Sequence, residues 1–239
     1  MTVARESIAG GPDVFLKTSP VRTTIEILTV LGLLYFIIAV GRANDYDLAG
    51  PVGILLSVII VGQLLRLRGS SWREFGLVKP ESLRKTLLGA LIAYVAMLVT
   101  VIPAATVIAN ILGETPDISG FDNIRSNFPL LMFWVLLSWL IGGFGEELIF
   151  RGFVMNRLAQ VFGGTRVAWA AALMLQAVIF GLGHSYQGTV GILVTGITGF
   201  VMGAIYLIAK RKLWIPILVH GLNDTVGFTL LYFGLIPTG

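Results

Sequence analysis

The chain has 239 residues, of which 56% are hydrophobic and only 13% are charged. Soluble domains carry about 25% charged residues, so this composition excludes an ordinary water-exposed surface and calls for a lipid solvent. The net charge of +4 does not indicate nucleic-acid binding, because the basic residues fall in short segments between apolar runs. Without cysteine, the chain has no disulfide, no thiolate metal ligand and no cysteine nucleophile.

Seven segments are apolar enough to cross about 30 Å of hydrocarbon as helices. They are expected at 23–41, 51–65, 87–109, 129–150, 167–183, 189–209 and 213–234. The sequence therefore predicts an all-α bundle of about seven transmembrane helices, forming a single domain over 23–239. The N-terminal segment 1–22 contains five charged residues and no apolar run, so we do not expect it to be a cleaved signal peptide.

The Lys and Arg residues alternate between rich and poor connections, which predicts the orientation of the bundle. Three lie in 1–22, six in 66–85, three in 151–166 and three in 210–212, all on one side of a seven-helix bundle. The other side has only Arg42 and Arg125. Because basic connections remain in the cytoplasm, we expect a multi-pass protein of the cell membrane with its N-terminus in the cytoplasm and its C-terminus outside.

Ionisable residues inside a membrane span cost at least ~2.5–3.5 kcal/mol each, so each is a candidate for function. Here they concentrate in three stretches in the second half of the chain. These are GFGEELIFR at 143–151, FGLGH at 180–184 and HGLND at 220–224. The last two stretches contain both histidines of the chain, which makes this set the candidate site.

The two adjacent glutamates of the first stretch are expected to differ in their partners. Glu147 and Arg151 are four residues apart, so they share a helix face and can pair. On an α-helix Glu146 is rotated by roughly 100° from Glu147. Glu146 is therefore the freer carboxylate and the candidate general base.

Each histidine also has a neighbour four residues away on the same helix face. Phe180 can position the ring of His184, and Asp224 can position that of His220. Suppose that the fourth helix continues to the glycine turn at 163–164 and that the fifth returns beside it. Glu147 and His184 would then differ in membrane depth by only about 6 Å. His220 lies roughly 12 Å from the cytoplasmic end of the last helix. We therefore expect the three stretches to converge in the inner half of the bilayer.

Other features are predicted to be structural. The single polar residues Glu26 and Gln176 are expected at helix interfaces, and 66–85 is expected to be a solvated cytoplasmic loop. A stripe of small residues, Gly191, Gly196, Gly199 and Gly203, is typical of close helix packing.

Three motifs in this order, Glu-Glu-x-x-x-Arg, Phe-x-x-x-His and His-x-x-x-Asn/Asp, resemble those of the CPBP family. These are intramembrane proteases of the CAAX prenyl protease and bacteriocin-processing (Abi) types. The resemblance covers a protease-like core at about 129–226, and WREFGL at 72–77 is similar to a family segment ahead of that core.

The resemblance implies a role for each motif residue. Glu146 would activate a water molecule for attack on a peptide carbonyl, and His184 would help to hold that water. His220 and Asp224 would stabilise the tetrahedral oxyanion or bind a metal, while Glu147 and its arginine would brace the site.

One position departs from the family. The family often has Asn where this chain has Asp224, and an ionised Asp cannot donate a hydrogen bond to an oxyanion. Asp224 could instead orient His220 or be protonated, with Asn223 as the donor. The sequence does not decide whether the site holds zinc, another divalent metal or no metal. Glu146, His184 and His220 could ligate a metal, but their spacing is not a standard zinc motif.

Two other classes of function fit the same residues. A proton-coupled transporter could use Glu146, His184 and His220 as a relay, although transporters commonly show repeats in both halves and the polar residues here lie in the second half only. In a catalytically silent scaffold, Glu147 and Arg151 would be a structural ion pair. A protease would act on a peptide or protein at the lipid bilayer, whether a prenylated protein, a leader peptide or a membrane protein.

Overall fold

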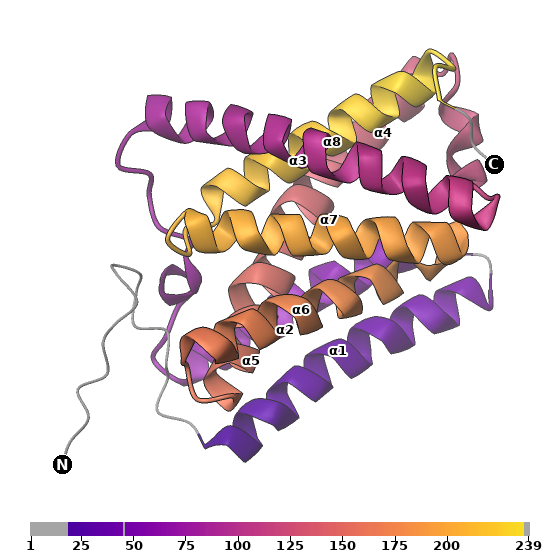
Figure 1. The fold of residues 1–239 in the computed structure, drawn as a ribbon. Helices are drawn as coiled ribbons and strands as arrows, with labels where there is room; N and C mark the ends of the chain where they lie inside the picture. Colours follow the sequence, from indigo (N-terminus) through magenta and orange to yellow (C-terminus); the bar gives the residue numbers. More distant parts are fainter. Residues whose placement is uncertain (1–18, 45, 237–239) are drawn as a thin grey trace.

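A computed structural model of the chain describes residues 19–44 and 46–236 (Figure 1). Most of the predicted N-terminal segment 1–22 thus lies outside the described residues. Within these ranges every regular element is a helix, so the predicted all-α class is confirmed. The elements in chain order are α1 (Pro20–Arg42), α2 (Ala49–Leu67), η1 (Trp72–Phe75), α3 (Leu83–Leu112), η2 (Ser119–Ile124), α4 (Phe128–Ser138), η3 (Trp139–Met155), α5 (Asn156–Val161), α6 (Arg166–Gly183), η4 (Ser185–Gln187), α7 (Gly188–Ile208) and α8 (Trp214–Tyr232).

Six helical stretches of the described chain are long and apolar enough to cross a membrane, close to the predicted seven. The seventh predicted span corresponds to α8, which has 19 residues and runs alongside the others (Figure 1). It falls short of the apolar spans because it carries the polar residues of the HGLND stretch. The six spans are Pro20–Arg42, Ala49–Leu67, Leu83–Leu112, Phe128–Val161, Arg166–Gly183 and Ser185–Ile208.

The helix ends follow ordinary capping chemistry. Side-chain oxygens at four helix starts accept hydrogen bonds from backbone N–H groups of the first turn, which would otherwise have no partner. The sharp turn between α5 and α6 uses Gly163 and Gly164 with φ of 91° and 70°, a left-handed conformation that favours glycine. The four capping residues are Ser19, Ser82, Asn127 and Thr165.

The long fourth span differs from the expected α-helix, because η3 is a π-helix of 17 residues between α4 and α5. π-Helices close i→i+5 hydrogen bonds and are frequent at functional sites. Where η3 gives way to α5, the amide nitrogen of Asn156 lies 2.8 Å from the carbonyl oxygen of Arg151 and 2.7 Å from that of Gly152. This side chain satisfies carbonyl groups at the change of helix type.

The connections fall at two opposite ends of the bundle (Figure 1). The α2–α3, α5–α6 and α7–α8 connections lie at one end, which we call the basic end because most of the Lys and Arg residues are there. The α1–α2, α3–α4 and α6–α7 connections and the end of α8 lie at the other, which we call the opposite end. The connections rich in Lys and Arg and those poor in them therefore lie at opposite ends of one bundle.

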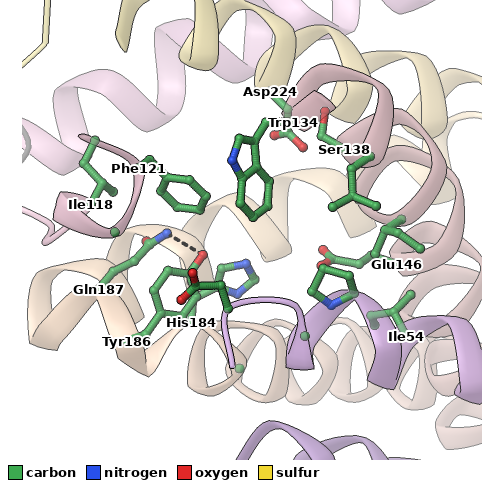
Figure 2. Close-up of a pocket in the computed structure, with 18 of the residues that line it drawn as sticks. Ile54, Ile118, Phe121, Trp134, Ser138, Glu146, His184, Tyr186, Gln187 and Asp224 are labelled. Atoms are coloured by element: carbon green, nitrogen blue, oxygen red, sulfur yellow. Dashed lines mark hydrogen bonds between the residues drawn. The ribbon is translucent and has the colours of Figure 1, made fainter. Parts of the chain in front are cut away.

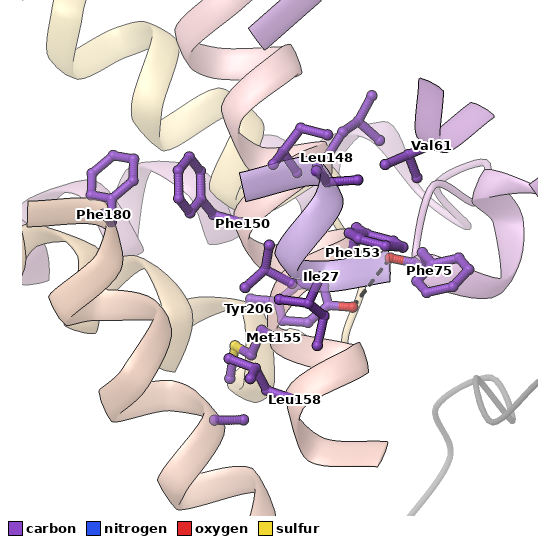
Figure 3. Close-up of a cluster of buried hydrophobic side chains, with 14 of the residues drawn as sticks. Ile27, Val61, Phe75, Leu148, Phe150, Phe153, Met155, Leu158, Phe180 and Tyr206 are labelled. Carbon is purple, nitrogen blue, oxygen red and sulfur yellow. Dashed lines mark hydrogen bonds between the residues drawn. The ribbon is translucent and has the colours of Figure 1, made fainter. Parts of the chain in front are cut away.

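The α2–α3 connection is not simply a solvated loop, in contrast to the prediction. Its short helix η1 places Phe75 in the core with 0% exposure, 6.3 Å from the ring of Phe153 (Figure 3). The Tyr206 hydroxyl donates a hydrogen bond to the Phe75 carbonyl oxygen at 3.1 Å. This segment closes the basic end of the bundle.

Glu26 also has more partners than the sequence indicated. It forms an ion pair with Arg68, and its Oε2 lies 3.6 Å from Nη2 of Arg157. The Arg157 side chain is only 1% exposed, so it is a core residue and not part of a solvated loop. A buried ionic cluster thus joins α1, the end of α2 and α5 beside the segment that carries Phe75.

The predicted glycine stripe does pack closely. A Cβ on Gly199 would lie 3.0 Å from Cδ1 of Phe180, and one on Gly203 would lie 2.7 Å from the Gln176 amide nitrogen. That same nitrogen donates to the Gly199 carbonyl oxygen at 2.9 Å. Small residues on α7 therefore let α6 approach its backbone, which is how helices associate in lipid.

Candidate active site

The three predicted stretches meet around one cavity of about 650 Å³. Figure 2 shows Glu146, His184 and Asp224 arranged around this hollow, although they come from η3, the end of α6 and α8. His220 and Asn223 of α8 line it as well. Glu146 and Asp224, which are 78 positions apart in the sequence, therefore line the same cavity.

Glu147 points away from the cavity into a fully buried ion pair. Its Oε1 accepts a hydrogen bond from Nη1 of Arg151 at 2.8 Å, and both side chains are 0% exposed. The same oxygen lies 2.8 Å from Nδ1 of His220. Arg151 also stands over the ring of Phe180, 4.5 Å from its centre. Glu147 is thus held on two sides and braces elements η3 and α8.

Glu146 has a different environment although it is the next residue. Its side chain is 18% exposed and lines the cavity. The nearest ionic partner is Nε2 of His220, 3.9 Å from Oε2, which is beyond hydrogen-bonding distance. This carboxylate is free to bind a water molecule.

The two histidines are oriented through their Nδ1 atoms. Nδ1 of His184 lies 2.9 Å from the Phe180 carbonyl oxygen, so it carries the proton and leaves Nε2 as the acceptor. The rings of these two residues are 4.8 Å apart, and the Phe180 ring also meets His220 edge-on at 6.3 Å. Phe180 therefore contacts both histidines and the buried arginine.

The polar end of α8 completes the lining. Oδ2 of Asp224 lies 3.6 Å from Nε2 of His220, and the Asn223 amide donates to Oδ1 of Asp224 at 3.4 Å. The four-residue spacing thus places Asp224 beside His220, as predicted. Both the carboxylate and the amide reach the cavity.

Glycines in η3 and α8 make room for this arrangement. A Cβ on Gly142 would lie 2.9 Å from Oδ2 of Asp224 and 3.3 Å from Nε2 of His220. A Cβ on Gly221 would lie 2.6 Å from the ring of Trp139. The two helices can bring their polar side chains together only because these positions lack side chains.

A metal does not fit the side chains as they are placed. Among the described residues, no three His, Asp or Glu side chains are grouped closely enough to hold an ion. Glu146, His184 and His220 share the cavity but do not form a three-ligand set, and structural zinc sites use four ligands and catalytic ones three.

Sequence reasoning missed the contribution of α1. Tyr35 lines the cavity, and its hydroxyl donates a hydrogen bond to the Ile179 carbonyl oxygen, which joins α1 to α6. Arg42 lies at the rim, where Nη1 donates to the Ser185 hydroxyl at 2.8 Å and Nη2 to the Gly183 carbonyl oxygen at 3.1 Å. Local sequence patterns do not connect Tyr35 or Arg42 with the site, because their partners lie more than 140 positions away.

Comparison with known families finds a match over the part of the chain that carries these residues. The sequence model of the Rce1-like type II CAAX prenyl endopeptidase family matches residues 128–226. The match supports a CPBP-family intramembrane protease. The match supports the CAAX endopeptidase type in the resemblance and adds nothing for the bacteriocin-processing type. No curated protein and no solved structure matches the chain.

The family match supports hydrolysis of peptide bonds by a multi-pass membrane protein. The matched segment begins at α4 and ends within α8, so it includes η3 and the two histidines. The α1 residues at the cavity lie outside it. The matched segment thus shares its cavity with a part of the chain that the family match does not cover.

Proposed function

We propose that the chain is an intramembrane endopeptidase in which Glu146 activates the attacking water. The contrast between the two neighbouring glutamates carries the proposal. Glu147 is fully buried and bound by Arg151 and His220, while Glu146 faces the cavity without a hydrogen-bond partner. A general base must be able to reach a water molecule, and only one of the two carboxylates can do so.

The hydrolysis uses groups that already face the cavity. Glu146 takes a proton from a water molecule, whose second hydrogen is held by Nε2 of His184. The oxygen attacks the carbonyl carbon of the scissile peptide, and the electron pair of the C=O bond moves to the oxygen. When the intermediate collapses, the C–N bond breaks and protonated Glu146 gives its proton to the leaving amine. The products are a carboxylic acid and an amine, and no step passes through a metal.

The developing oxyanion needs hydrogen-bond donors on the α8 side of the cavity. Nδ1 of His220 is engaged by Glu147, so its Nε2 is the nitrogen that can donate toward the cavity when protonated. The Asn223 amide is the second donor. Asp224 acts as a positioning residue, because its carboxylate lies 3.6 Å from Nε2 of His220 and favours the protonated ring.

The substrate is a peptide or protein at the lipid bilayer. We place the chain in the cell membrane as a single multi-pass domain over 23–239, with the protease core at about 129–226 and the N-terminus in the cytoplasm. Prenylated proteins, leader peptides and membrane proteins all belong to this substrate class.

The decisive experiment compares two conservative substitutions in detergent-solubilised protein assayed with a peptide library. Glu146→Gln keeps the shape of the side chain but cannot accept a proton, so cleavage should fall about 10²–10⁴-fold, the usual contribution of a general base. The matched control is Glu114→Gln, on an exposed residue of the α3–α4 connection, which should cleave normally. Unchanged cleavage by Glu146→Gln would remove the proposal, and proton-driven uptake by liposomes would then favour a transporter.

A further inference from the structure

The cavity extends from the catalytic side chains to the opposite end of the bundle. Its lining includes residues of every connection at that end: the α1–α2, α3–α4 and α6–α7 connections and the segment after α8. Several of these residues are exposed, including Arg42, Asp47, Gly120 and Tyr186. The cavity therefore opens to solvent at this end.

The basic end is closed beneath the same cavity. No described residue of the α2–α3, α5–α6 or α7–α8 connections lines it. Between the cavity and this end lie the buried Glu147–Arg151 pair, the Phe75 side chain and the cluster of Glu26 and Arg157. A peptide could reach Glu146 from the basic end only if these buried contacts separated.

The distribution of charge assigns a side of the membrane to each end. Of the 17 Lys and Arg residues, only Arg42 and Arg125 belong to the segments at the opposite end. Short connections rich in Lys and Arg remain in the cytoplasm, so the mouth of the cavity faces away from it.

We propose that the protease admits its substrate from the non-cytoplasmic face of the membrane. The inference rests on the proposed function and specifies its substrate class: a largely apolar polypeptide segment of a secreted or membrane protein that reaches the bilayer from outside the cytoplasm. The wall of the mouth is formed mainly by apolar side chains, among them Ile118, Phe121 and Ile236. Such a wall suits apolar side chains of an extended peptide better than a charged one.

The rim is organised for access from this side. Arg42 is tied to Ser185 and to the Gly183 carbonyl oxygen, and its guanidinium stands 5.4 Å from the centre of the Tyr186 ring. These contacts join the end of α1 to the connection after His184. A substrate segment that enters at the rim therefore meets a fixed edge immediately above a catalytic histidine.

The absence of cysteine makes a direct accessibility test possible. Three Ser→Cys variants place one thiol each at the basic end (Ser71), in the cavity (Ser138) and at the rim (Ser185). The probe is a membrane-impermeant maleimide added to spheroplasts of a bacterial host. Ser138→Cys and Ser185→Cys should be labelled in intact spheroplasts, whereas Ser71→Cys should lose its protection only after permeabilisation.

Labelling of Ser71→Cys in intact spheroplasts with protection of Ser185→Cys would reverse the orientation and overturn the inference. Protection of Ser138→Cys while Ser185→Cys is labelled would also overturn it, because the cavity would then not open at the rim. Labelling needs no catalysis, so these outcomes are independent of the proposed function. A second readout is cleavage of an impermeant peptide by intact spheroplasts. If Glu146-dependent cleavage appears only after permeabilisation, the protease proposal stands and the inferred direction of entry falls.

Discussion

The Glu147–Arg151 pair allows the energetics of the buried brace to be tested. Both side chains are 0% exposed, and their charged atoms are 2.8 Å apart. Replacing Arg151 with Met keeps most of the side-chain volume but leaves a buried carboxylate without its main partner. Breaking a buried pair in this way costs ~3–5 kcal/mol of unfolding free energy. Because His220 still lies 2.8 Å from Glu147, we expect the lower end of this range.

The assay is denaturant unfolding in mixed detergent micelles, with Glu147→Gln and the double variant completing a cycle. Replacing both charges removes the unpaired ion, so the double variant should be more stable than the two single losses added together, with a coupling of up to about 3 kcal/mol. The control is Lys212→Met, which breaks an exposed ion pair with Glu81 and should leave stability nearly unchanged. A loss under about 1 kcal/mol for Arg151→Met, or single losses that simply add in the double variant, would refute the reasoning.

Two further predictions concern the cavity itself. Gly142→Ala would place a Cβ 2.9 Å from Oδ2 of Asp224 and displace the side chains beside His220. Cleavage should slow by roughly tenfold or more, equivalent to about 1.4 kcal/mol of activation free energy. The control Gly32→Ala has nothing within 4 Å of its added Cβ and should cleave normally, so equal rates for the two variants would contradict this account. Treatment with a strong chelator followed by gel filtration should leave Glu146-dependent cleavage intact, because no three ligand side chains are grouped among the described residues. A loss of activity that a divalent ion restores would show instead that the site rearranges to bind a metal.

Much of this fold could be predicted from the sequence because lipid restricts the possibilities. A backbone in hydrocarbon must satisfy its own hydrogen bonds, so each apolar segment of sufficient length predicts a helix. The cost of burying charge then makes the few ionisable residues informative. The four-residue spacings correctly paired Glu147 with Arg151 and placed Asp224 beside His220, because both pairs are local in the chain.

The remaining features depend on contacts between distant segments. Glu26 and Arg157 are 131 positions apart, and no local pattern indicates that they meet in a buried cluster. Phe75 lies in a charged stretch that reads as a solvated loop, and its burial follows from the space left by Phe153 and Tyr206. The π-helix likewise cannot be recognised from apolar periodicity, because that periodicity does not show where hydrogen bonding changes from i→i+4 to i→i+5.

Adjacent positions on one helix give the two glutamates different environments. Adjacent residues on any helix point in different directions, so the two carboxylates lie on different faces of η3. Here the inward direction meets Arg151 and His220, and the other meets the cavity. The inward carboxylate orients His220 through Nδ1, while Glu146 lies 3.9 Å from Nε2 of the same ring. One imidazole thus links the bound carboxylate to the free one, and in the proposed mechanism Glu147 holds this ring while Glu146 activates the water.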